Sequence, residues 1–101
     1  MQPSNSTNNS PALPKLKMLV VDDDLTFRKR LVKALTARGY ETCDAGTAAE
    51  GIEAARRTDP QRAIVDLRMP GASGLQLVSD LIEMDPDIEV IVLTGDRKSV
   101  V

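Results

Sequence analysis

Carboxylate and hydroxyl side chains follow three short apolar runs of this chain, each at the point where the run ends. Met-Leu-Val-Val leads into Asp22 and Asp23, Ala-Ile-Val leads into Asp66, and Val-Ile-Val-Leu leads into Thr94. Carboxylates that gather in one place repel one another unless a cation or a proton lies among them. Oxygen ligands of this kind suit a hard divalent cation. The pattern therefore predicts a metal or phosphoryl site if the fold brings the three run ends together.

The elements that would position these groups are strands of a parallel sheet. Continuous apolar runs of this length are typical of strands buried on both faces. Parallel strands present their carboxyl ends at one edge, which is where open α/β sheets bind ligands. Helical patterns and turn residues separate the runs, and a weaker strand is expected at residues 40–45. The alternation of four strands with three helices predicts a doubly wound α/β fold with right-handed crossovers.

The helix boundaries follow from capping and breaking residues. Asp24 is placed to cap a helix of about residues 25–38, with Gly39 as its end. Residues 47–50 have the pattern of a capping box that opens a second helix, and a third follows Gly74. The first helix has an apolar face and a basic run, residues 28–30, which we interpret as facing water. The apolar face comprises Phe27, Leu31, Ala34 and Leu35.

Composition excludes several classes of function. The 101 residues suffice for one small domain, with 42% apolar and 28% charged residues. A net charge of −2 and only two aromatic residues, Phe27 and Tyr40, argue against nucleic acid as a ligand of this segment. The chain has no His, so any phosphohistidine donor must be another molecule.

The ends of the chain and its cysteine give weaker signals. Residues 1–14 (MQPSNSTNNSPALP) are polar and broken by Pro, which predicts a disordered lead. The N-terminus has no basic start followed by an apolar segment, and Cys43 is alone. These features favour a cytoplasmic protein without membrane contact, in which Cys43 is a packing residue.

From about Lys17 to Gly95 the chain resembles the receiver domain of two-component response regulators. The run LVVDDD looks like the family's acidic pair, DLRMP with a later Gly looks like its phosphoacceptor loop, and LTG looks like its switch segment. Three motifs in this order, each ending a predicted strand, are a specific signal. The resemblance implies a flavodoxin-like sheet with strand order 2-1-3-4, in which the family's fifth strand is missing.

The resemblance also implies roles for individual residues. Asp66 would be the phosphoacceptor, and Thr94 would be the switch hydroxyl that bonds a phosphoryl oxygen. Mg²⁺ would be held by Asp23, Asp66 and the backbone carbonyl of Arg68, with Asp22 completing the metal site through a water molecule. The implied partner is a sensor histidine kinase, and the implied role is signalling rather than enzymatic.

Three stretches suggest a subgroup of this family. Residues 38–41 (RGYE), 63–68 (AIVDLR) and 92–95 (VLTG) are similar to redox-type global regulators with a Fis-type helix-turn-helix output. This similarity implies a longer parent protein that regulates transcription and forms a homodimer.

The sequence departs from the family pattern at its end. The family continues with another helix, a fifth strand ending in Lys-Pro, and a last helix, whereas this chain stops at Val101. Residues 96–101 (DRKSVV) match one reading frame of a common sequencing adapter. We therefore expect a receiver domain at residues 15–95, truncated at its C-terminus, and a tail at 96–101 that does not belong to the family.

Two other functions remain open on the sequence alone. Residues 22–26 (DDDLT) also fit the Asp-x-Asp-x-Thr pattern of haloacid-dehalogenase-type phosphatases, with Asp22 as nucleophile, Asp24 as general acid and Thr94 in the second motif. That interpretation leaves the loop after Asp66 unexplained. The third possibility is a pseudo-receiver, which keeps the fold for protein contacts without being phosphorylated.

Overall fold

The computed structural model describes residues 15–69 and 74–93. Strands and helices alternate along this part of the chain, as the sequence predicts. The predictions for residues 1–14, for Thr94 and for the tail at 96–101 lie outside the described residues. The elements are β1 (Lys17–Val21), α2 (Leu25–Ala37), β2 (Glu41–Ala45), α3 (Ala48–Thr58), β3 (Arg62–Asp66), α4 (Gly74–Met84) and β4 (Glu89–Leu93).

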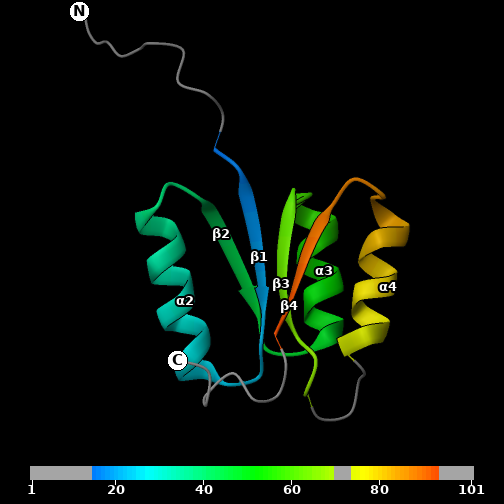
Figure 1. The fold of residues 1–101 in the computed structure, drawn as a ribbon, viewed down its shortest axis with the longest axis horizontal. Helices are drawn as coiled ribbons and strands as arrows, with labels where there is room; N and C mark the ends of the chain where they lie inside the picture. The colour runs from blue at the N-terminus through cyan, green and yellow to red at the C-terminus, as the bar shows by residue number, and fades with distance from the viewer. Residues whose placement is uncertain (1–14, 70–73, 94–101) are drawn as a thin grey trace, which may run out of the picture.

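The described strands form one parallel sheet in the order β2-β1-β3-β4. This confirms the predicted α/β class and the predicted order 2-1-3-4. In the register of the sheet, Val21 lies opposite Val65 and Asp66 lies opposite Leu93. The carboxyl ends of β1 and β3 are therefore neighbours at one edge, the lower edge in Figure 1.

The helices cover the two faces of the sheet unequally. Helices α3 and α4 lie on one face and α2 lies on the other (Figure 1). The larger core packs between the sheet and the α3–α4 layer, where Leu19, Val65, Leu77 and Leu81 are fully buried. The smaller core lies under α2 and includes Val20. Because β1 is buried on both faces, residues 18–21 of this strand are all apolar, as expected for a central strand of a parallel sheet.

The α2 face is the thinner of the two. No residue of α2 is fully buried. Its apolar contacts with the sheet come from Leu31, Val32 and Leu35, whereas Ala34, which the spacing places on the apolar face, is exposed. At the edge of the described sheet, Ile91 of β4 is 48% exposed. Among the described elements, α2 is the one helix on this face, and it leaves part of β4 uncovered.

The helix ends follow the predicted capping residues. The Asp24 carboxylate accepts a hydrogen bond from the Phe27 amide at 3.0 Å at the start of α2. Gly39 follows Arg38, the C-cap of that helix, and has φ +99°, a conformation that glycine adopts without strain. The Thr47 hydroxyl accepts from the Glu50 amide at 3.1 Å and opens α3. Within the described residues, no helix combines the length and the apolar character needed to cross a bilayer.

Candidate functional site

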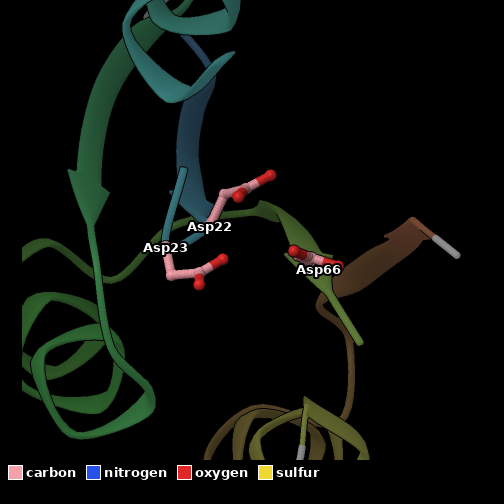
Figure 2. Close-up of side chains that lie close together, drawn as sticks. All are labelled: Asp22, Asp23 and Asp66. Carbon is pink, nitrogen blue, oxygen red and sulfur yellow. The ribbon is translucent and has the colours of Figure 1, made fainter. Parts of the chain in front are cut away.

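Asp22, Asp23 and Asp66 lie together at the carboxyl edge of the sheet. One carboxylate oxygen of each lies within 4.8 Å of the corresponding oxygens of the other two. Figure 2 shows Asp22 and Asp23 on the connection after β1 and Asp66 at the end of β3. The side chains are far apart in sequence and meet because β1 and β3 are adjacent parallel strands. This is the juxtaposition predicted for the carboxylates at the ends of the first two runs, whereas Thr94 at the end of the third run lies outside the described residues.

The position of Asp22 is fixed by its backbone. Its amide donates to the Ala45 carbonyl at 3.1 Å, which extends the pairing of β1 with β2 by one residue. Its own carboxylate accepts from the Asp24 amide at 2.9 Å, so the chain turns immediately after the strand. Asp22 is fully buried, while Asp23 is exposed. The pair therefore consists of one buried carboxylate and one solvent-exposed carboxylate.

Asp66 is the last residue of β3 and is only 1% exposed. One of its carboxylate oxygens, Oδ1, accepts from the Arg68 amide at 3.0 Å. The next residue, Leu67, donates its amide to the Leu93 carbonyl at 3.1 Å, which ties the loop to the end of β4. Asp66 is thus held by the strand before it and by the turn after it.

The donor set fits a hard divalent cation. All three groups are carboxylates, and no His or Cys belongs to the cluster. Oxygen-only ligands with several negative charges favour Mg²⁺ or Ca²⁺ over softer transition metals. Cys43 lies elsewhere, where its thiol is 3.5 Å from the Thr58 hydroxyl. The residues present therefore fit a hard divalent cation next to the buried Asp66 carboxylate.

Other residues singled out from the sequence have different positions. Asp24 does not belong to the acidic cluster, because its carboxylate caps α2. Arg68 follows the turn after Asp66 and is exposed. Thr94 lies outside the described residues, although Leu93 before it is at the same sheet edge as Asp66. The Pro70 to Ser73 part of the loop is also outside them.

One residue at the site was misinterpreted from the sequence. Arg28 is not part of a solvated helix face, since its side chain is only 15% exposed. Its Nε donates to an Asp44 carboxylate oxygen at 2.6 Å, and its Nη1 donates to the Asp22 carbonyl at 2.8 Å. Lys29 and Arg30 beside it are exposed as expected. The sequence did contain one signal for this contact. Asp44 is a carboxylate inside a predicted strand, where an unpaired charge is unfavourable, so a basic partner for it was to be expected.

The sheet order and the acidic cluster define a class of protein. Residues 18–101 match the response regulator receiver domain, and the chain belongs to this family. The family assignment confirms the resemblance inferred from the three motifs. A receiver domain is a signalling domain rather than an enzyme in the usual sense, so the family does not support the phosphatase alternative.

The curated relatives are regulatory proteins. The chain is 40% identical over 82 residues to the acid tolerance regulatory protein ActR of Rhizobium meliloti, covering 81% of this chain and 42% of the relative. It is 45% identical over 78 residues to the photosynthetic apparatus regulatory protein RegA of Cereibacter sphaeroides, covering 77% of this chain and 42% of the relative. The chain therefore spans about two fifths of the length of these relatives.

Solved receiver structures have the same fold. A CheY-like receiver domain protein from Methanospirillum hungatei has a TM-score of 0.78 at 28% identity, covering 81% of this chain and 66% of that one. A Burkholderia pseudomallei response regulator with a phosphorylated aspartic acid and a calcium ion has a TM-score of 0.76 at 33% identity, covering 80% of this chain and 48% of that one. The Thermotoga maritima regulator TrrA with Mg²⁺-BeF has a TM-score of 0.74 at 30% identity, covering 84% of this chain and 76% of that one.

Proposed function

We propose that this chain is the phosphoacceptor part of a two-component response regulator and that Asp66 accepts a phosphoryl group from the phosphohistidine of a sensor histidine kinase. The observation that carries the proposal is the buried Asp66 carboxylate within 4.8 Å of the Asp22 and Asp23 carboxylates. The related structures with a phosphorylated aspartic acid and with Mg²⁺-BeF support it.

The transfer forms one bond and breaks another. An Asp66 carboxylate oxygen attacks the phosphorus of the donor, an O–P bond forms, and the N–P bond of the phosphohistidine breaks. The N–P electron pair stays on the imidazole nitrogen, and the ring, which carries a proton on its other nitrogen, leaves as neutral imidazole. The product on this chain is an acyl phosphate. Because this reaction mainly needs in-line placement and cancellation of negative charge, a fixed carboxylate next to a cation site is sufficient.

Asp22, Asp23 and Asp66 would hold Mg²⁺, together with the backbone carbonyl of Arg68. The cation supplies the positive charge that lets a carboxylate and a phosphoryl group approach each other. The buried Asp22 and the exposed Asp23 give the site one fixed ligand and one ligand open to exchange with water.

The response to phosphorylation would begin at Thr94. We propose that its hydroxyl bonds a phosphoryl oxygen and that the segment after β4 shifts with it. The relatives are longer regulatory proteins, so the readout would be an output domain that controls transcription, with homodimer formation in the full-length protein. A receiver of this kind would act in the cytoplasm, where its kinase partner presents the phosphohistidine.

Phosphorylation by acetyl phosphate tests the proposal directly. The protein is incubated with acetyl phosphate and Mg²⁺, and the label is measured on phosphate-affinity gels for wild type, Asp66→Asn and Asp22→Asn. Asp87→Asn is the matched control, because Asp87 is exposed in the loop before β4 and outside the acidic cluster. We expect label on wild type and Asp87→Asn, slow label on Asp22→Asn, and none on Asp66→Asn.

Each alternative predicts a different pattern of label. Label that persists on Asp66→Asn and disappears from Asp22→Asn would favour the phosphatase-type assignment, in which Asp22 is the nucleophile. Absence of label from every form, with the chain folded by circular dichroism, would favour a pseudo-receiver.

A further inference from the structure

A partly buried arginine, Arg28, ties the connection that carries Asp22 and Asp23 to the neighbouring strand β2. We propose that Arg28 is a positioning residue: it holds this connection in place through the Asp22 carbonyl and thereby supports the cation site. The inference rests on the proposed function for the identity of the cation, but the contacts of Arg28 do not depend on it.

The guanidinium of Arg28 makes two directed hydrogen bonds. Nε donates to Asp44 Oδ2 on β2 at 2.6 Å, and Nη1 donates to the carbonyl of Asp22 at 2.8 Å. The two acceptors belong to different elements, and Arg28 itself lies in α2. One planar group therefore joins α2, β2 and the end of β1. The backbone of Asp22 is therefore held at its carbonyl by Arg28 of α2 and at its amide by Ala45 of β2.

The space for this guanidinium depends on a residue without a side chain. A Cβ added at Gly46 would lie 2.9 Å from Nη1 of Arg28. Gly46 directly follows β2. A larger residue there would press on the nitrogen that reaches Asp22.

Burial makes the pair with Asp44 stronger than a surface ion pair. The side chains of Arg28 and Asp44 are 15% and 20% exposed. A second basic side chain lies near the same Asp44 oxygen: Nζ of Lys29 is 3.5 Å away, but the Lys29 side chain is 61% exposed. Loss of Arg28 would leave the half-buried Asp44, among the residues that the structure describes, with this weaker partner, and the Asp22 carbonyl without its arginine donor.

Charge and position predict opposite effects on cation binding. A positive guanidinium bonded to the backbone of Asp22 repels a divalent cation at the Asp22 carboxylate, so its removal should tighten binding if charge alone mattered. If position matters more, its removal should weaken binding, because a ligand held loosely binds less well. Lysine at position 28 keeps the charge but lacks the planar fork. The pair of variants Arg28→Gln and Arg28→Lys separates the two effects.

The experiment measures Mg²⁺ affinity by calorimetry and amide hydrogen exchange by NMR in the absence of metal. We expect Arg28→Gln and Arg28→Lys to bind Mg²⁺ about tenfold more weakly than wild type, the lower end of what outer contacts of metal ligands contribute. In both variants the amides of Asp22 and Asp24 should exchange faster, since the first donates to the Ala45 carbonyl at the end of β2 and the second to the Asp22 carboxylate, and both bonds depend on the position of the connection.

Arg62→Gln is the matched control. Arg62 also forms an ion pair, with Glu89 at 2.8 Å, but its side chain is 36% exposed and it lies at the start of β3, away from the cluster. The pKa of Arg62 is raised, mainly by electrostatic interaction with Tyr40 and to a lesser extent by Glu89. Arg62→Gln therefore removes a positive charge, as Arg28→Gln does. Its replacement should leave both the Mg²⁺ affinity and the exchange at Asp22 and Asp24 unchanged.

Specific results would overturn the inference. Equal or tighter Mg²⁺ binding by Arg28→Gln would show that Arg28 does not position the site, and so would unchanged exchange at Asp22 and Asp24. If Arg28→Gln does not fold, Asp44→Asn replaces it, because it weakens the anchor of Arg28 and should give the same two changes to a smaller extent. If wild type binds no Mg²⁺, the proposed cation site fails, while the exchange data still decide whether Arg28 orders the connection.

Discussion

Gly74 packs directly on the backbone of Leu67. A Cβ added at Gly74 would lie 2.6 Å from Leu67 Cα and 2.7 Å from the Asp66 carbonyl oxygen, closer than real Cβ contacts come. Gly74 is buried and is the first residue of α4. The start of this helix therefore lies against the loop that follows the proposed phosphoacceptor, and only glycine fits between them.

Replacement of Gly74 by alanine should separate the helix from the loop. We expect Gly74→Ala to lower the free energy of unfolding by about 1–3 kcal/mol, as overpacking does in a well-packed site. Because Asp66 would shift with its loop, phosphorylation by acetyl phosphate should also slow. Urea unfolding and the gel assay measure the two effects.

Gly39→Asn is the comparison for this variant. Gly39 has no atom within 4 Å of an added Cβ, and its positive φ is one that Asn tolerates better than most residues. We expect a smaller loss of stability and normal phosphorylation. A Gly74→Ala protein with wild-type stability and label would show that the loop can move away at no cost.

Mg²⁺ should stabilise the folded chain if the acidic cluster is a cation site. Since the unfolded chain has no such cluster, binding shifts the unfolding equilibrium by mass action, by about 1.4 kcal/mol at a Mg²⁺ concentration of ten times Kd. Thermal unfolding should therefore move to higher temperature with Mg²⁺ and return with EDTA. Asp22→Asn should lose most of this shift, whereas Asp87→Asn should keep it. An identical shift in Asp22→Asn would place the cation elsewhere.

Asp24 should matter for stability and not for phosphoryl transfer. Its carboxylate caps α2 through the Phe27 amide, so Asp24→Ala should lower the free energy of unfolding by about 1 kcal/mol. Label from acetyl phosphate should remain on Asp66. Thr26→Ala, an exposed change in the same first turn, is the control for stability. Loss of label from a folded Asp24→Ala protein would contradict the role of Asp24 as a helix cap alone.

The edge of the sheet should promote self-association. Ile91 is 48% exposed on β4, which pairs only with β3 among the described strands. Exposed apolar edge strands associate, and a lysine on them opposes this. We expect Ile91→Lys to reduce light scattering at high protein concentration. Leu75→Lys, at a position 66% exposed on α4, is the control and should have a smaller effect. Equal scattering in both variants would argue against edge pairing.

Local patterns in the sequence were enough to predict the elements and most of the candidate site. Parallel strands buried on both faces have apolar runs whose ends are visible in the sequence, and Asp22, Asp23 and Asp66 stand at those ends. Caps such as Asp24 and Thr47 act within a few residues of themselves, so a local pattern is sufficient to find them. The order of the strands came from the resemblance to a known family rather than from these patterns.

Contacts between distant segments could not be predicted in the same way. The basic run of α2 reads as a solvated face, but the packing of α2 against β2 turns Arg28 inward to Asp44 and Asp22 while Lys29 stays in water. The requirement for glycine at Gly74 likewise depends on how closely α4 approaches the loop after β3. The residues that end the strands can be inferred from the sequence, because strand patterns are local. The side chains that hold those ends in place become visible in the folded protein, because their burial and their partners depend on elements brought together from distant parts of the chain.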